Sequence, residues 1–132
     1  MADLAHNKSK SYRWRTVVSL VLTTMGVLAV DGEVVRPKRE RRVRLSEYFA
    51  GPEDEPERGD IEGLRRFVIN TRDQSKRDLS GALDEAHADA QHDGKQFYAV
   101  VFTRPGRDPR EGYVLTRLDV FGSMVAELEN KA

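Results

Sequence analysis

Cysteine is absent from this sequence, which excludes disulfide bridges and thiolate metal sites. A cysteine-free chain suits a reducing compartment, so we expect a cytoplasmic protein. The sequence also lacks a glycine-rich phosphate loop, a nucleophile elbow and a zinc-ligand pattern. Its three histidines, His6, His87 and His92, show no metal-ligand spacing. Any chemistry at a site in this protein would therefore depend on carboxylate, amide and guanidinium groups.

A net charge is also missing, because 22 basic residues balance 22 acidic ones. No global field would steer the protein towards nucleic acid. The charge is uneven along the chain, however. Residues 36–44 contain six basic residues and one acid, whereas residues 53–60 contain five acids and one base. We consider Arg39 and Arg41, in the basic strip, as candidate nucleic-acid contacts. The alternative is that both segments are ordinary solvated surface.

No apolar run is long enough to span a bilayer. The longest, Val17–Val30, follows several basic residues and superficially resembles a signal peptide, but it has only 14 residues and no convincing cleavage site follows it. We interpret it as a buried helix that leads into a strand, and we expect no membrane association.

The chain length suits one domain with a modest core. Residues 1–10 are polar and are expected to form a disordered tail, which leaves residues 11–132 as the domain. A helix is predicted from Ser11 to Gly26, with Trp14 as a core anchor. Asp31-Gly32 favours a tight hairpin turn between two short strands, and residues 42–45 alternate like a further strand.

The second half of the chain predicts an α/β arrangement. Asp78 is a suitable N-cap for a helix that Gly94 would end. Residues 97–103 are apolar enough for a central strand, and residues 113–115 form a second short strand. A final helix, opened by a capping box from Thr116 to Asp119, is expected to bury one apolar face. That face consists of Leu118, Phe121, Met124, Val125 and Leu128. The order predicts a single domain with a mixed central sheet flanked by helices.

The segment Gly59–Asp73, GDIEGLRRFVINTRD, contains the strongest candidate site. A turn with Asp60 leads to an apolar strand that ends in Asn70 and Arg72. These two side chains share one face of the strand, because successive side chains alternate. Asp60 would lie beside them if the two segments form a hairpin. An acid next to a polar strand end is a reasonable template for metal-assisted phosphodiester chemistry.

Three stretches resemble the small phage and actinobacterial nucleases of the Holliday-junction-resolvase-like, restriction-endonuclease-like class. They are GDIEG at 59–63, DLSGALDEAHADA at 78–90 and AVVFTRPGRDPREGYVLTRLDVF at 99–121. The resemblance covers rather more than half of the chain. It implies a restriction-endonuclease-like fold in which an aspartate and a glutamate hold Mg²⁺, and a lysine two residues after the glutamate completes the site.

Against that pattern, the site of this chain is degenerate. Asp60 matches the aspartate, but Asn70 stands in place of the glutamate and Arg72 in place of the lysine. Arg15 occupies the position where the first helix often supplies another acid. An amide weakens a site for a hard cation, and a guanidinium stays protonated and cannot act as a base. The resemblance therefore implies impaired catalysis at Asp60, Asn70 and Arg72, with no cofactor bound.

Two other acids are candidates for restoring a metal site. Glu62 shares a face with Asp60 if the segment is extended, which makes the pair Asp60 and Glu62 a weak candidate for metal binding. Asp73 faces away from Asn70 and is more readily explained as a turn residue. Arg72 would either contact phosphate or pair with Asp60, and we favour pairing because an uncompensated cation and anion attract each other.

The basic loop 104–112 contains Arg104, Arg107 and Arg110, which are candidate contacts to a nucleic-acid backbone or simply exposed loop residues. Together these features predict a catalytically impaired nuclease-fold protein that binds branched or duplex DNA. One alternative is an active Mg²⁺-dependent endonuclease with a relocated acid. Another is a protein-interaction factor, acting on a host protein if the chain is phage-encoded, whose apolar N-terminal helix and hairpin form a homodimer or partner surface.

Overall fold

The computed structural model describes residues 2–38, 57–73 and 78–131, with side chains from Tyr12 onward. The chain begins with helix α1 (Ala2–Thr24), followed by strands β1 (Arg36–Pro37), β2 (Ile61–Glu62) and β3 (Phe67–Arg72). Helix α2 (Leu79–Asp93) and strand β4 (Phe97–Phe102) come next. A short 3-10 helix, η3 (Pro109–Glu111), precedes strand β5 (Tyr113–Leu115) and helix α3 (Leu118–Asn130). The expected strand at 42–45 lies outside the described residues.

The main sheet has the order β3-β4-β5 and is mixed. β3 and β4 are parallel, with Phe67 opposite Phe97, whereas β5 is antiparallel to β4. Because parallel neighbours need a crossover connection, α2 links β3 to β4. The second sheet consists of β1 and β2, antiparallel to each other. The prediction of an α/β fold with a mixed sheet between helices is confirmed, including a central position for β4.

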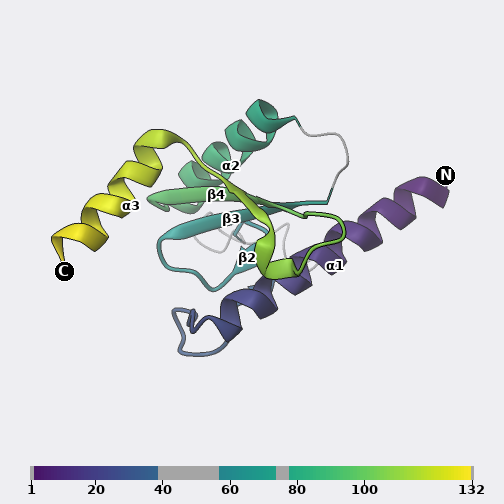
Figure 1. The fold of residues 1–132 in the computed structure, drawn as a ribbon, viewed down its shortest axis with the longest axis horizontal. Helices are drawn as coiled ribbons and strands as arrows, with labels where there is room; N and C mark the ends of the chain where they lie inside the picture. Colours follow the sequence, from purple (N-terminus) through teal and green to yellow (C-terminus); the bar gives the residue numbers. More distant parts are fainter. Residues whose placement is uncertain (1, 39–56, 74–77, 132) are drawn as a thin grey trace, which may run out of the picture.

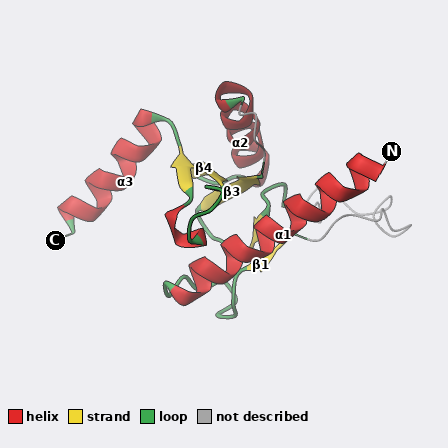
Figure 2. Ribbon diagram, turned by 45° about the vertical axis from the view of Figure 1, so that its right-hand side comes forward, coloured by secondary structure: helices red, strands yellow, loops and turns green. Residues whose placement is uncertain are grey.

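α1 and α2 lie on opposite sides of the β3–β4 pair (Figures 1 and 2). Each side has its own apolar cluster, because side chains of a strand alternate between the faces. The α2 side contains Val68, Ala82, Ala86, Ala90, Tyr98, Val100 and Phe102. The α1 side contains Trp14, Val18, Ala29, Val35, Ile61 and Leu64. The indole N–H of Trp14 donates to the carbonyl of Val101 at 3.1 Å, so this residue is the predicted core anchor.

Local signals set the ends of the helices. The Asp78 side chain accepts a hydrogen bond from the amide of Gly81, and Gly94 adopts the left-handed conformation with φ 67°, as predicted for the two ends of α2. Gly26 has φ 89° after α1. At its other end α1 begins at Ala2, whereas the sequence predicts that the helix starts at Ser11.

Glycine is required at position 63 for two reasons. Its φ is +99°, and a Cβ there would lie 2.9 Å from the Cβ of Ala29. The carbonyl of Gly63 also accepts from the amide of Val30 at 2.7 Å. This close approach attaches the turn after α1 to the segment that leads into β3. Within this turn, the predicted hairpin is present as a single antiparallel β-bridge between Leu28 and Val34.

Two predictions for α3 are wrong. No residue of this helix is buried, and Leu118 and Leu128 are 83% and 73% exposed. The expected core face of Leu118, Phe121, Met124, Val125 and Leu128 therefore does not meet the core. The predicted capping box is also absent: Arg117 is the N-cap, and the hydroxyl of Thr116 donates to the carbonyl of Tyr98 at 2.6 Å instead.

Among the described residues, none of the helices combines the length and the apolar character that a bilayer span requires.

Candidate functional site

Asp60 lies beside the carboxyl-terminal half of β3, as the sequence predicts. Its backbone amide donates to the carbonyl of Ile69 at 3.1 Å and to Oδ1 of Asn70 at 3.2 Å. In return, its Oδ2 accepts from the amide of Thr71 at 2.8 Å and from the hydroxyl of Thr71 at 3.3 Å. The three predicted positions, 60, 70 and 72, are therefore brought together at the end of this strand.

Two guanidinium groups contact the carboxylate of Asp60. Arg15, from α1, lies 3.2 Å from Oδ1, and Arg72 lies 3.6 Å from Oδ2. All three side chains are mostly buried: 14% of the Asp60 side chain, 17% of Arg15 and 20% of Arg72 are exposed. Arg15 also donates to the carbonyl of Lys38 at 2.7 Å. The pairing of Arg72 with Asp60, favoured on sequence grounds, is present, and Arg15 adds a second cation.

One face of α2 presents a stripe of acids to the same segment. Glu85, Asp89 and Asp93 are spaced four residues apart, so they lie on one side of the helix. Glu85 accepts from Arg72 at 2.6 Å, and Asp89 accepts from the amide nitrogen of the Asn70 side chain at 2.9 Å. Asn70 and Arg72 thus share the face directed at α2, as the alternation of the strand predicts.

The third acid of the stripe, Asp93, holds the backbone just before Asp60. Its carboxylate accepts from the amide of Arg58 at 2.9 Å and from the amide of Gly59 at 3.1 Å, and only 2% of its side chain is exposed. The acidic face of α2 therefore contacts both β3 and the two residues just before Asp60.

The pKa values of Asp89 and Asp93 are shifted in opposite directions, because their hydrogen bonds differ. The pKa of Asp89 is raised above its ordinary value by desolvation and by the nearby Glu85 and Asp93, against the lowering effect of the Asn70 hydrogen bond. Burial also acts to raise the pKa of Asp93. There, however, hydrogen bonds from His92 and from the amides of Arg58 and Gly59 outweigh it, and the pKa is lowered.

The residues around Asp60 do not fit a divalent cation. Mg²⁺ prefers several oxygen ligands and dehydrates reluctantly. The carboxylate of Asp60 faces the guanidinium groups of Arg15 and Arg72. It also accepts from the amide of Thr71, and the side-chain oxygen of Asn70 accepts from the amide of Asp60. Across the described ranges, no three acidic, histidine or cysteine side chains are grouped so that they could hold a metal ion.

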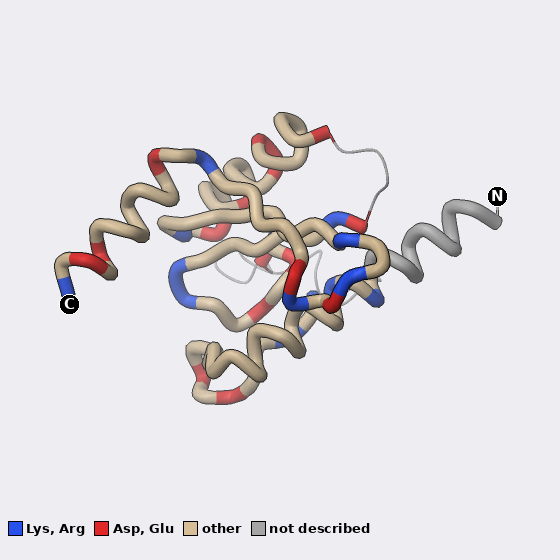
Figure 3. The backbone as a smooth tube through the Cα atoms, viewed as in Figure 1, with Lys and Arg blue, Asp and Glu red and all other residues tan. Residues whose placement is uncertain are grey.

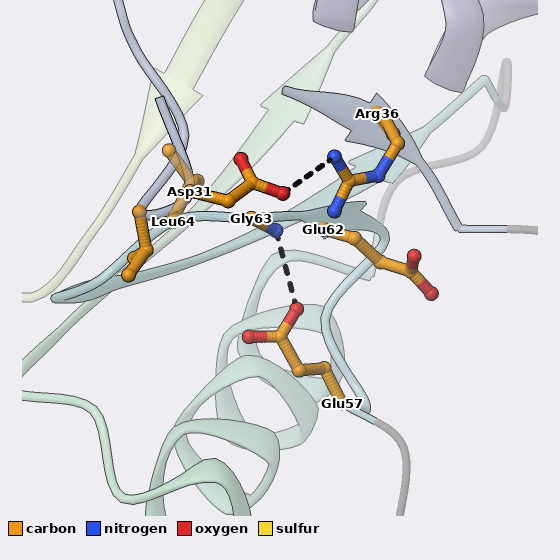
Figure 4. A pocket seen from close by; sticks show the side chains of 7 residues that line it. Asp31, Arg36, Glu57, Glu62, Gly63 and Leu64 are labelled. Carbon is orange, nitrogen blue, oxygen red and sulfur yellow. Dashed lines mark hydrogen bonds and ion pairs between the residues drawn. The ribbon is translucent and has the colours of Figure 1, made fainter. Parts of the chain in front are cut away.

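Glu62 does not complete a metal site with Asp60. It lies opposite Arg36 across the β1–β2 pair and lines an open hollow of ≈ 540 Å³ with Arg36, Asp31 and Glu57 (Figure 4). Arg36 lies 3.4 Å from Asp31, and Glu57 accepts from the amide of Gly63 at 3.3 Å. Asp73 is also engaged elsewhere, because its carboxylate accepts from the hydroxyl of Thr103 at 3.0 Å.

The arginines of loop 104–112 follow β4 at the same edge of the sheet, because the parallel strands β3 and β4 end together. Figure 3 shows basic and acidic segments interleaved along this loop, on the side of the molecule where α1 begins. The guanidinium of Arg104 lies 4.6 Å from the ring centroid of Tyr113. Arg107 lies 3.9 Å from Glu111, and Arg110 lies 3.2 Å from Asp108. Arg39 and Arg41 lie outside the described residues.

Sequence reasoning missed several members of the site. Thr71 contacts Asp60 from within the 58–72 segment, and Glu85, Asp89 and Asp93 contact this segment from α2. None of the four was a predicted site residue. The four-residue spacing of the acids was a usable signal for a common helix face. What the spacing does not indicate is that this face meets β3 rather than solvent.

Comparisons of the chain with protein-family models, with curated proteins and with solved structures found no match. The resemblance to resolvase-like nucleases therefore remains a prediction from the three sequence stretches.

Proposed function

We propose that this protein is a catalytically inactive, nuclease-like binding protein for DNA, which holds the DNA backbone at loop 104–112. The observation that carries the proposal is the neutralisation of Asp60 by Arg15 and Arg72. A carboxylate that is paired with two guanidinium groups has little affinity left for a divalent ion. Asn70 and Arg72, which stand in place of the second acid and the lysine, cannot themselves act as general bases.

The binding surface follows from the position of the arginines. Arg107 and Arg110 are 57% and 72% exposed, and among the described residues each is paired with an acid of its own loop, at 3.9 Å and 3.2 Å. Such exposed pairs contribute little to stability. A phosphate is a better partner for a guanidinium fork than a mobile, hydrated carboxylate. Exchange of Glu111 and Asp108 for DNA phosphates would therefore cost the fold little.

The test is a titration of labelled four-way junction, duplex and single-stranded DNA, followed by fluorescence anisotropy at several salt concentrations. The triple variant Arg104→Ala/Arg107→Ala/Arg110→Ala is expected to weaken binding. It should also reduce the slope of log affinity against log salt by about one for each arginine that contacts phosphate. The matched control is Arg117→Ala, which removes another exposed arginine paired with a nearby acid, Asp119, and is expected to bind as the parent does.

The same samples test the absence of catalysis. Incubation of the junction with Mg²⁺ or Mn²⁺ is expected to leave the DNA intact. Nicking that Asp60→Ala abolishes would overturn the proposal in favour of a metal-dependent endonuclease. No binding at low salt would overturn it in the other direction, towards a protein that acts on another protein.

A further inference from the structure

Helix α3 displays an exposed apolar face that no described part of the chain covers. Leu118, Phe121, Val125 and Leu128 are 83%, 54%, 39% and 73% exposed. Their spacings of three, four and three residues place them along one side of the helix, in the a and d positions of two heptads. We call these four residues the α3 seam.

The attachment of α3 to the rest of the chain is slight. Val120 packs against the cluster on the α2 side, and Glu127 pairs with Arg66. These two residues lie on a different side of the helix from the seam. The helix has 13 residues, and none is buried. A helix of this length is marginal in water, and its stability normally comes from burying an amphipathic face.

A second group of exposed apolar residues lies near the end of α1 and in the turn that follows it. It consists of Leu20, Met25, Leu28, Val30 and Val34, each more than half exposed. We call it the hairpin patch. Leu28 pairs with Val34 across the turn, while Ala29 and Val35, next to them in sequence, are buried. The inner side of the turn therefore packs on the core, and the outer side is apolar as well.

The two elements that carry these surfaces lie towards one side of the molecule. In Figures 1 and 2 the free end of α3 and the turn after α1 are both on the side away from the start of α1. From these exposed fractions, the seam and the hairpin patch each present roughly 500 Å² of apolar side chain. Each alone is near the upper limit for a monomer. Their sum, about 1,000 Å², exceeds the roughly 800 Å² that one partner buries in a stable interface.

We propose that a second copy of this chain covers both surfaces, with the α3 seam of each protomer seated on the hairpin patch of the other. A twofold axis makes the exchange reciprocal, so each protomer buries a seam and a patch. Pairing of the two seams alone would use only about half of the required area, and two heptads are short for a coiled coil. This proposal is independent of the one about DNA.

A membrane surface is a poorer occupant for the seam. Helices that lie on membranes usually carry lysine and arginine on their polar face. The polar side chains of α3 include Asp119, Glu127 and Glu129, and no basic residue occurs within the helix. Anionic lipid would repel such a helix, whereas a second apolar protein surface would not.

The experiment is sedimentation velocity of the full chain over a range of concentrations, with four proteins. They are the parent, the seam variant Leu128→Lys, the patch variant Leu28→Glu, and the control Ala126→Lys, which adds the same charge to an exposed position outside the seam. The parent and the control are expected to dimerise equally. Each of the other two should weaken dimerisation by about a hundredfold or more, because it buries an unpaired charge.

A mixture of the two variants tests the reciprocal arrangement. A heterodimer of Leu128→Lys with Leu28→Glu contains one intact contact, and its other contact brings opposite charges together. Mixing is therefore expected to restore dimers that neither variant forms alone. Far-ultraviolet circular dichroism at low concentration should show that both variants are folded, since the altered residues are exposed.

Three outcomes would overturn the proposal. The first is a parent that stays monomeric at high concentration. The second is a patch variant that dimerises like the parent, which would assign the interface to the seam alone. The third is a folded pair of variants whose mixture stays monomeric.

Discussion

Replacing Asp60 by asparagine distinguishes a structural anion from a metal ligand by the sign of its effect on stability. Acids that line a metal site repel one another in the absence of the metal, so that neutralising one of them stabilises the protein. Asp60 instead compensates two arginines. We therefore expect Asp60→Asn to destabilise the fold, because it leaves Arg15 and Arg72 without their shared anion.

The size of the effect follows from the contacts. Breaking a buried ion pair on one side costs about 3–5 kcal/mol. The discount for solvent is small, since only 14% to 20% of these side chains is exposed. Asparagine keeps an oxygen that can accept from the amide of Thr71, but that bond loses its charge, which is a difference of about 1 kcal/mol. Because Arg72 keeps Glu85 as a partner at 2.6 Å, the expected loss is about 2–4 kcal/mol.

Urea denaturation, followed by circular dichroism, measures this loss directly. In a chain of this size each kcal/mol corresponds to a Tm change of about 3–5 °C, so thermal unfolding should confirm it. The control is Asp108→Asn, which breaks an exposed pair with Arg110 and should cost less than about 0.5 kcal/mol. An Asp60→Asn protein that is as stable as the parent, or more stable, would refute the assignment of Asp60 as a paired structural anion.

Four further predictions concern the rest of the site, the core and the end of α2. Asp93→Asn should lower the free energy of unfolding at neutral pH and have less effect in acid. The depressed pKa of Asp93 means that its contribution is present above the ordinary value of 3.8 and is lost as the pH falls through the folded value. Asp89→Asn should do the opposite and stabilise the protein at neutral pH, because the raised pKa makes ionisation of Asp89 unfavourable in the fold. Urea denaturation at neutral and at acid pH measures the effects of both substitutions. Trp14→Phe removes the hydrogen bond to the carbonyl of Val101 and some core volume, and should cost about 1.5–3 kcal/mol in the same assay, whereas an unchanged stability would contradict its role as a core anchor. Gly94→Ala should lower the free energy of unfolding by about 1 kcal/mol, and Tm with it, because φ is 67° at this position. The loss comes from the backbone conformation alone, since no atom lies within 4 Å of the added methyl group.

Local signals predicted the helices and strands of the second half well. Asp78 and Gly94 act through contacts within a few residues of their own positions, so the ends of α2 can be predicted without the tertiary fold. The apolar run of β4 likewise requires burial on both faces, and the structure provides it. Thr116 failed as a cap because a distant carbonyl, that of Tyr98, binds its hydroxyl. Competition between a local cap and a partner that is distant in sequence cannot be predicted from the neighbouring residues alone.

For the candidate site, the sequence placed Asp60, Asn70 and Arg72 together but not their other partners. Alternation along one strand is enough to put Asn70 and Arg72 on one face. Which residues of α2 meet that face depends on how the crossover helix rotates over the sheet, and pairwise spacing does not determine this. Glu85 and Asp89 were therefore missed.

The final helix shows a different limit of sequence reasoning. Its apolar periodicity correctly predicts a helix with one apolar side, from Leu118 to Leu128. The period does not specify what that side contacts, because a core of the same chain and the surface of another molecule impose the same pattern. The prediction of a buried face was wrong for this reason.

The unit formed by β3, α2 and β4 has a consequence for how the protein opens. β4 is hydrogen-bonded on both edges, and most of its side chains are buried. Its amides should be the slowest to exchange with deuterium, because their exposure requires global unfolding. The amides of α3 should exchange much faster in a dilute sample, through local fraying that leaves the remainder of the structure intact. A protease would then be expected to remove the C-terminal segment first, at a rate set by that fraying and not by the stability of the whole fold.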